Sequence, residues 1–160
     1  MGNSFIYDRA VWQAYLGNIN YAVSTTKMFA ILGTVSPTLA NKQAWYQYTN
    51  VQYIGAGNPY EINTVTTGYA LGGNVMSTAA PVISTDTINY GATAQVFTAA
   101  ANAIAASYLT IQYAASSSTK TTNPLLSNHD LQGSQSVTNG TLTLTWPSNI
   151  AFSWTSSAAA

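Results

Sequence analysis

Alternation of apolar and polar positions is clearest near the C-terminus of the chain. Apolar residues of 141–146 alternate with threonines and place Trp146 on the inward face, and 150–154 repeats the pattern after a proline-containing turn. Because successive side chains of a strand point to opposite faces, both segments are predicted strands. Asn139-Gly140 is a two-residue hairpin signal. Segment 135–138 and these two strands are therefore predicted to form a three-stranded meander.

Two earlier segments carry different apolar patterns. Residues 27–35 (KMFAILGTV) are apolar on both faces and end before Pro37, which predicts a central strand buried on both sides. Residues 107–113 place Leu109 and Ile111 on one face and polar side chains on the other. This second pattern predicts a half-buried strand.

The remaining strands have weaker signals. Aromatic or β-branched residues predict strands at 42–53, 81–90 and 95–98, and a short one that begins at Leu125. Glycine, proline or polar clusters predict the loops between them, at 54–60, 68–73 and 116–123. The glycines of 68–73 are expected where two backbone segments approach closely.

The segment YDRAVWQAYL, which begins at Tyr7, predicts a short amphipathic helix. Tyr7, Val11 and Tyr15 recur every four residues and are expected on the face that covers the sheet. Ser4 is the expected N-terminal cap, and Gly17 supplies the left-handed residue that ends the helix.

About eight short strands, with one helix at the start, predict an all-β fold rather than an alternating α/β fold. The expected architecture is a single-domain antiparallel β-sandwich, of jelly-roll or Ig-like type. No linker or repeat divides the chain, so residues 1–160 are one predicted domain. Within it, 1–18 form an N-terminal arm with the helix, 26–155 the sandwich and 156–160 a flexible tail.

Charge is scarce in this sequence. Charged residues make up 5% of it and the formal net charge is zero, whereas 47% is hydrophobic and 12% aromatic. A soluble domain ordinarily carries about one quarter charged residues. The surface is therefore expected to be neutral and hydrogen-bonding, and without mutual repulsion such a surface favours association.

The composition also argues against several partners and sites. The four basic residues, Arg9, Lys27, Lys42 and Lys120, are scattered, so no patch for nucleic acid is expected. No apolar run is long enough to span a bilayer, and the N-terminus does not resemble a signal peptide, so no membrane is expected. Cysteine is absent, which excludes disulfides and fits assembly in a reducing cytoplasm.

Catalytic groups are few. Besides His129, the ionisable set comprises Asp8, Glu61, Asp86 and Asp130. Asp130 follows His129 directly and would point to the other side of a strand, which argues against a hydrolytic triad. His129 is instead expected to be exposed in a loop. Glu61 and Asp86 could pair as in a glycosidase, but surface turns are their commoner place. No enzyme activity, metal or cofactor is predicted.

The aromatic residues leave two interpretations open. Eleven tyrosines and four tryptophans could line a carbohydrate-binding face, because their rings pack on sugars and keep a polar group. The same side chains are enriched at protein interfaces. Core packing together with protein contacts is the favoured account.

Several segments together resemble small virion structural proteins of tailed bacteriophages, which decorate (cement) capsids or belong to tails. They are YDRAVWQAYLGNINY, TKMFAILGTV, YEI, TGYALGG, YLTIQYAAS and SQSVTNGTLTLTWPSNIAFSW. The likeness spans most of the chain, although the commoner members of the family carry more acidic residues in their strands and loops. It implies a β-rich protein present in many copies on a virion, assembled in the host cytoplasm, and without catalytic residues to carry over.

The leading hypothesis is a homo-oligomeric capsid decoration protein that clamps the major capsid protein or other virion proteins. The candidate interface residues lie in the N-terminal arm and in a loop: Phe5, Tyr7, Trp12, Tyr15, Asn58 and Tyr60. The alternative is a tail or fibre adhesion module that binds host surface glycans through exposed tyrosine and tryptophan.

Overall fold

The computed structural model describes most of the chain. The described residues are 4–17, 19, 27–44, 47, 50–51, 60–62, 69–78, 81–84, 87–100, 103–114 and 123–155. The predicted flexible tail and most of the predicted loops at 54–60 and 116–123 lie outside them.

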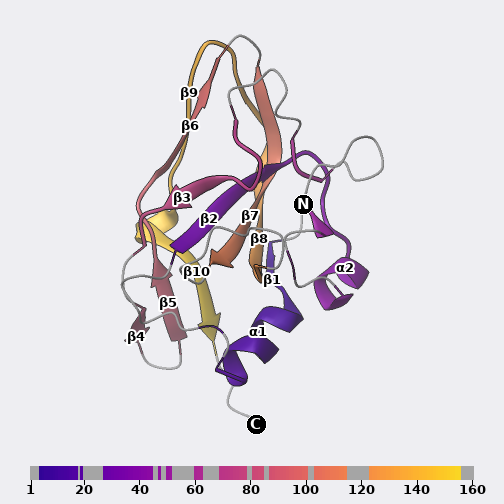
Figure 1. The fold of residues 1–160 in the computed structure, drawn as a ribbon. Coiled ribbons are helices and arrows are strands. Elements are labelled where there is room, and N and C mark those ends of the chain that lie inside the picture. The colour runs from indigo at the N-terminus through magenta and orange to yellow at the C-terminus, as the bar shows by residue number, and fades with distance from the viewer. Residues whose placement is uncertain are drawn as a thin grey trace.

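Ten strands and two α-helices form within the described residues (Figure 1). The strands are β1 (Phe5–Ile6), β2 (Lys27–Gly33), β3 (Asn74–Met76), β4 (Val82–Ser84), β5 (Thr87–Gly91), β6 (Gln95–Ala99), β7 (Ile104–Ala114), β8 (Leu125–Val137), β9 (Gly140–Leu144) and β10 (Ile150–Thr155). The helices are α1 (Asp8–Tyr15) and α2 (Leu39–Ala44), and a 3-10 turn (Pro147–Asn149) precedes β10.

The strands form antiparallel sheets, so the predicted all-β class is confirmed. A five-stranded sheet has the order β1-β8-β7-β2-β3, a three-stranded sheet has the order β10-β5-β4, and β6 pairs with β9. The long strands β7 and β8 run through the middle of the molecule, with β10 and β5 beside their lower part and α1 at the base (Figure 1).

Strand β2 is an interior strand, as its two apolar faces predicted. It pairs with β7 on one side and with β3 on the other, and its residues from Ala30 to Gly33 are buried. It ends at Gly33, where a Cβ would lie 2.6 Å from the carbonyl oxygen of Tyr60. The backbone of that neighbouring segment therefore selects glycine at the end of the strand.

Strand β7 is longer and more deeply buried than the predicted half-buried strand. Leu109 and Ile111 are buried on one face, and Thr110 and Gln112 are buried on the other. The expectation of a solvated polar face was wrong, because polar partners inside the molecule cover it: Gln112 donates to the carbonyl oxygen of Gly72 at 3.1 Å.

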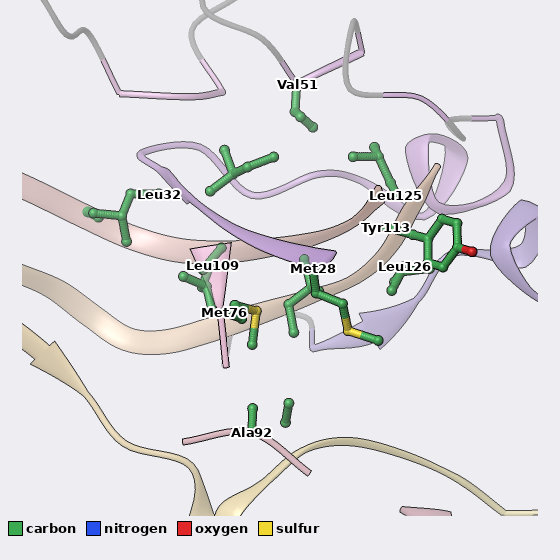
Figure 2. Close-up of a cluster of buried hydrophobic side chains, with 14 of the residues drawn as sticks. Met28, Leu32, Val51, Met76, Ala92, Leu109, Tyr113, Leu125 and Leu126 are labelled. Atoms are coloured by element: carbon green, nitrogen blue, oxygen red, sulfur yellow. The ribbon is translucent and has the colours of Figure 1, made fainter. Parts of the chain in front are cut away.

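Hydrophobic side chains gather on both faces of the five-stranded sheet. Figure 2 shows Met28, Met76 and Leu109 on the side that faces Ala92, whereas Leu125 lies on the side of Val51. Full burial of one such side chain contributes about 1.5–3 kcal/mol. The sheet is thus covered on both faces, which fits a layered β fold.

Helix α1 matches the predicted helix in position but differs in its cap and its buried face. Tyr7 is the N-cap and makes no side-chain cap bond, while the predicted cap, Ser4, accepts a hydrogen bond from the backbone N–H of Asp130. Tyr15 is exposed, and Ala10 is buried in its place. Because Tyr7 is still extended, its side chain enters the core before the helical period begins. Gly17 follows with φ of 74°, as predicted.

Helix α2 replaces the first part of the strand predicted at 42–53. Thr38 and Asn41 cap each other: the Thr38 N–H donates to Asn41 Oδ1 at 2.7 Å, and the Asn41 N–H donates to Thr38 Oγ1 at 3.3 Å. This reciprocal cap satisfies backbone groups that a helix start leaves unpaired. The aromatic residues that prompted the strand prediction lie mostly outside the described residues.

The predicted C-terminal meander was wrong, although its turn is present. Asn139 has φ of 51° between β8 and β9, but β9 pairs with β6 and β10 pairs with β5. Leu142 lies opposite the buried Phe97 in that pairing. Such an apolar cross-strand pair stabilises β9 away from β8. The inward–outward alternation of 141–146 is confirmed.

Two further strand predictions changed in extent. The single strand predicted at 81–90 is the antiparallel pair β4–β5. The short strand predicted from Leu125 continues through His129 to Val137. The strand at 95–98 is confirmed as β6.

Candidate binding cleft

The predicted interface residues lie in different environments. Tyr7 is fully buried, so the structure corrects its assignment to an interface. Phe5 is half-buried in β1, and its ring meets the Tyr7 ring edge-on at 5.1 Å. Tyr60 is half-buried, and Asn58 lies outside the described residues. Part of the predicted N-terminal arm therefore belongs to the hydrophobic core, because the pairing of β1 with β8 brings the Tyr7 side chain into it.

The exposed members of the set are Trp12 and Tyr15, on one side of α1. They are 53% and 82% exposed, and their rings stack at 6.0 Å with an angle of 22° between planes. Leu16, at the end of the helix, is also exposed. We call Trp12, Tyr15 and Leu16 the α1 aromatic face. Beside it, Lys42 of α2 and Asp8 of α1 form an exposed ion pair at 2.6 Å.

His129 is placed differently from its prediction. It belongs to β8 rather than to a loop, and its side chain is half-buried. Its Nε2 lies 2.9 Å from Ser127 Oγ, because residues two apart on a strand share a face. Its ring meets the Trp146 ring edge-on at 5.3 Å.

Two adjoining cavities open around this histidine, and we call them together the His129 cleft. Their volumes are about 530 and 410 Å³. Ser4, His129, Trp146 and Pro147 line both. The larger cavity lies between β1 and β8 on one side and β10 on the other, and the smaller one follows β8 toward the end of β9. Volumes of this size are typical of small-molecule sites.

The cleft is nearly free of charge. Burial lowers the pKa of His129 to about 4, so its imidazole is neutral at pH 7. Among the described residues that line the cleft, one is charged, Asp130. Its Oδ1 accepts a hydrogen bond from the N–H of Gln132 at 2.8 Å. The walls therefore offer hydroxyl groups, amides, apolar side chains and one indole ring.

The Ser127–His129 pair has a hydrogen bond but lacks other parts of a hydrolytic site. Ser127 is 1% exposed. Among the described residues, His129 Nε2 pairs with Ser127 Oγ, and the neighbouring acid, Asp130, accepts from the N–H of Gln132 instead. The pair can hold the imidazole in place, and the arrangement does not orient it as a general base.

Glu61 belongs to a buried polar network on the other face of the five-stranded sheet. Its Oε1 accepts hydrogen bonds from Tyr69 Oη at 2.9 Å and from the N–H of Gly72 at 2.7 Å. Tyr69 Oη also accepts from the N–H of Leu32 at 3.2 Å. Glu61 is 1% exposed, and Asp86, its possible partner in the glycosidase reading, lies outside the described residues. The carboxylate thus binds the segment that leads into β3 instead of facing solvent.

The described residues include no cluster of three or more potential metal-ligating side chains of the His, Cys, Asp and Glu types. Among the same residues, no helix has the length and apolar character needed to cross a membrane.

Comparisons with family models, curated proteins and solved structures give no match to this chain. The resemblance to virion proteins stays a prediction.

Sequence reasoning missed the His129 cleft. The alternation that placed Trp146 inward was a usable signal, as was the spacing of two between Ser127 and His129. The pairing of β10 with β5, which forms the far wall, has no local signal in the sequence.

Proposed function

We propose that this chain is a non-enzymatic virion structural protein that decorates a capsid and binds the coat through its α1 aromatic face. The observation that carries the proposal is the exposure of Trp12, Tyr15 and Leu16 together on one short helix. Tryptophan and tyrosine are the residues that most often dominate the energy of protein interfaces. An exposed stacked pair is therefore a suitable anchor for a neighbouring subunit.

Charge supports a neutral protein partner. The chain has four basic and four acidic residues in 160, and two of these eight, Asp8 and Lys42, neutralise each other beside the aromatic face. The three side chains of the face itself are uncharged, so contact with a partner there depends on apolar area and not on charge. Binding would depend on buried area, with about 800 Å² per partner in a standard interface.

Location on the particle is the first test. Antibodies against this chain are applied to intact phage particles from cultures that express it, followed by electron microscopy. The proposal expects label over the head at many copies. Label confined to the tail, or no label on any particle, contradicts it.

A sedimentation assay with emptied capsids tests the face itself. The double variant Trp12→Ser/Tyr15→Ser should lose at least about tenfold in capsid affinity, as expected when interface anchors are truncated. Ile83→Ser is the matched control, because Ile83 is an exposed apolar residue of β4. Equal co-sedimentation of the double variant and the control contradicts a role for the α1 aromatic face.

The second candidate function is a tail or fibre adhesion module that binds glycans. The His129 cleft favours it, because that cleft combines an indole ring with neutral hydrogen-bonding walls. Head labelling in the microscopy experiment would count against this candidate, and tail labelling would support it.

A further inference from the structure

We propose that the His129 cleft binds a neutral carbohydrate, with Trp146 as the ring on which a sugar packs. The inference rests on the second candidate function and is independent of the capsid-decoration proposal. It gives the glycan a site that differs from the exposed Trp12–Tyr15 pair.

The lining has the chemistry that recognises sugar hydroxyl groups. Side-chain hydroxyls and amides line the two cavities, from Ser4, Ser148, Ser153, Thr143, Thr145, Gln132 and Gln135. Each hydroxyl can donate and accept, and each amide offers both kinds of group. The hydroxyl groups of a sugar can therefore form hydrogen bonds with these donors and acceptors in place of water.

The lack of charge narrows the ligand class. No lysine or arginine is among the lining residues, so the cleft has no cation for a phosphate or carboxylate. One acid, Asp130, is too few for a polyvalent cation. His129 is neutral at pH 7, so it can join a hydrogen bond without adding charge. A neutral polar ligand fits the walls best.

The key side chains are held before any ligand arrives. Trp146 Nε1 donates to the carbonyl oxygen of Thr93 at 3.0 Å, which fixes the indole plane. Ser127 holds His129, whose ring packs against Trp146. In the lining of the smaller cavity, Gln135 Nε2 donates to the carbonyl oxygen of Leu131 at 3.1 Å. Preorganised walls lower the entropy that binding must overcome.

The test is a titration of the ¹⁵N-labelled full chain with three neutral probes, maltohexaose, cellohexaose and N-acetylchitohexaose, followed by NMR. With at least one probe, the Trp146 indole signal and the backbone signals of Thr145 and Ser153 should shift and saturate. Trp146→Ala should weaken binding by about tenfold or more, as truncation of a dominant aromatic contact does. Trp12→Ala is the matched control and should bind like the wild type.

Ser153→Leu keeps the test decisive if Trp146→Ala fails to fold. Ser153 is exposed and lines the larger cavity, so a leucine there fills the cleft without disturbing the core. It should also weaken binding about tenfold or more. The inference is overturned if no probe shifts the cleft signals, if the shifts centre on Trp12 and Tyr15, or if Ser153→Leu binds normally. Such a failure removes the glycan site and leaves the capsid-labelling experiment unaffected.

Discussion

Gly73→Ala should unfold this protein or nearly so, because the added methyl group both strains the backbone at a positive φ and clashes with a neighbouring strand. Gly73 has φ of 78°, and a Cβ at this position would lie 2.0 Å from the carbonyl oxygen of Ala30. That carbonyl belongs to β2, an interior strand paired on both sides, so it has no room to retreat. The substitution must push apart β2 and the segment that leads into β3.

Gly17→Ala separates the two costs. Gly17 has φ of 74°, almost the same backbone conformation, but a Cβ there has no atom within 4 Å. Gly17→Ala should therefore lower the free energy of unfolding only by the cost of a left-handed backbone at alanine, about 1–2 kcal/mol. Gly73→Ala carries the same cost plus the clash, and the total should exceed about 4 kcal/mol, a size reached only by severe core or strain mutations. Much of a small domain's total stability, about 5–15 kcal/mol, would be lost.

Urea unfolding followed by circular dichroism measures both variants against the wild type. The midpoint of Gly17→Ala should move slightly with an unchanged slope, whereas Gly73→Ala should unfold at far lower urea or show no folded baseline. Similar midpoints for the two variants would refute the reasoning, because the close approach of Gly73 to β2 would then contribute nothing.

Three further predictions concern other parts of the structure. Glu61→Leu should lower the free energy of unfolding by about 2–5 kcal/mol, because it leaves the Tyr69 hydroxyl and the Gly72 N–H without their acceptor. Glu61→Gln should lower it by less than half of that, and urea unfolding compares the two variants. Stability should fall as the pH drops from about 6.5 toward 4, because the unfolded state gains a proton that native His129, with its pKa near 4, does not take up. The pKa difference corresponds to a loss of about 3 kcal/mol of unfolding free energy, which becomes about 2 kcal/mol for a half-buried ring. His129→Gln should flatten the plot of unfolding free energy against pH between about 6.5 and 4. An unchanged plot would exclude His129 as the cause. Trp12→Ser/Tyr15→Ser should change the unfolding free energy by less than about 0.5 kcal/mol per site, since both side chains are exposed.

Local patterns predicted the elements of this fold better than their partners. The two apolar faces of 27–35 predicted an interior strand, and the alternation in 141–146 predicted which side chains face inward; both are confirmed. The meander failed because strand pairing is decided by distant segments, such as the one that places Phe97 opposite Leu142. Helix α2 was missed because the aromatic residues of 42–53 predicted a strand, whereas the helix begins at a Thr38–Asn41 cap.

The same limit explains the candidate sites. The exposure of Trp12 and Tyr15 depends on where α1 begins, and Tyr7 shifts that point by entering the core in an extended conformation. His129 was expected in a loop, because a short apolar start gives no sign that β8 extends over 13 residues. Its cleft needs β10 as a second wall, and β10 arrives there through its pairing with β5.

The α1 aromatic face and the His129 cleft are both poor in charge, but their shapes suit different ligands. A flat exposed ring pair gains most by excluding water across a broad apolar contact, which only another folded surface supplies. A recessed indole between hydroxyl groups is too narrow for such a contact, but it accommodates a single polar chain whose hydroxyls replace water one by one. Since neither surface attracts a partner at long range through charge, electrostatic steering adds little to the association rate at either surface. If many copies act together on one particle, as the proposed function requires, linked weak contacts raise avidity at both surfaces without any new interaction.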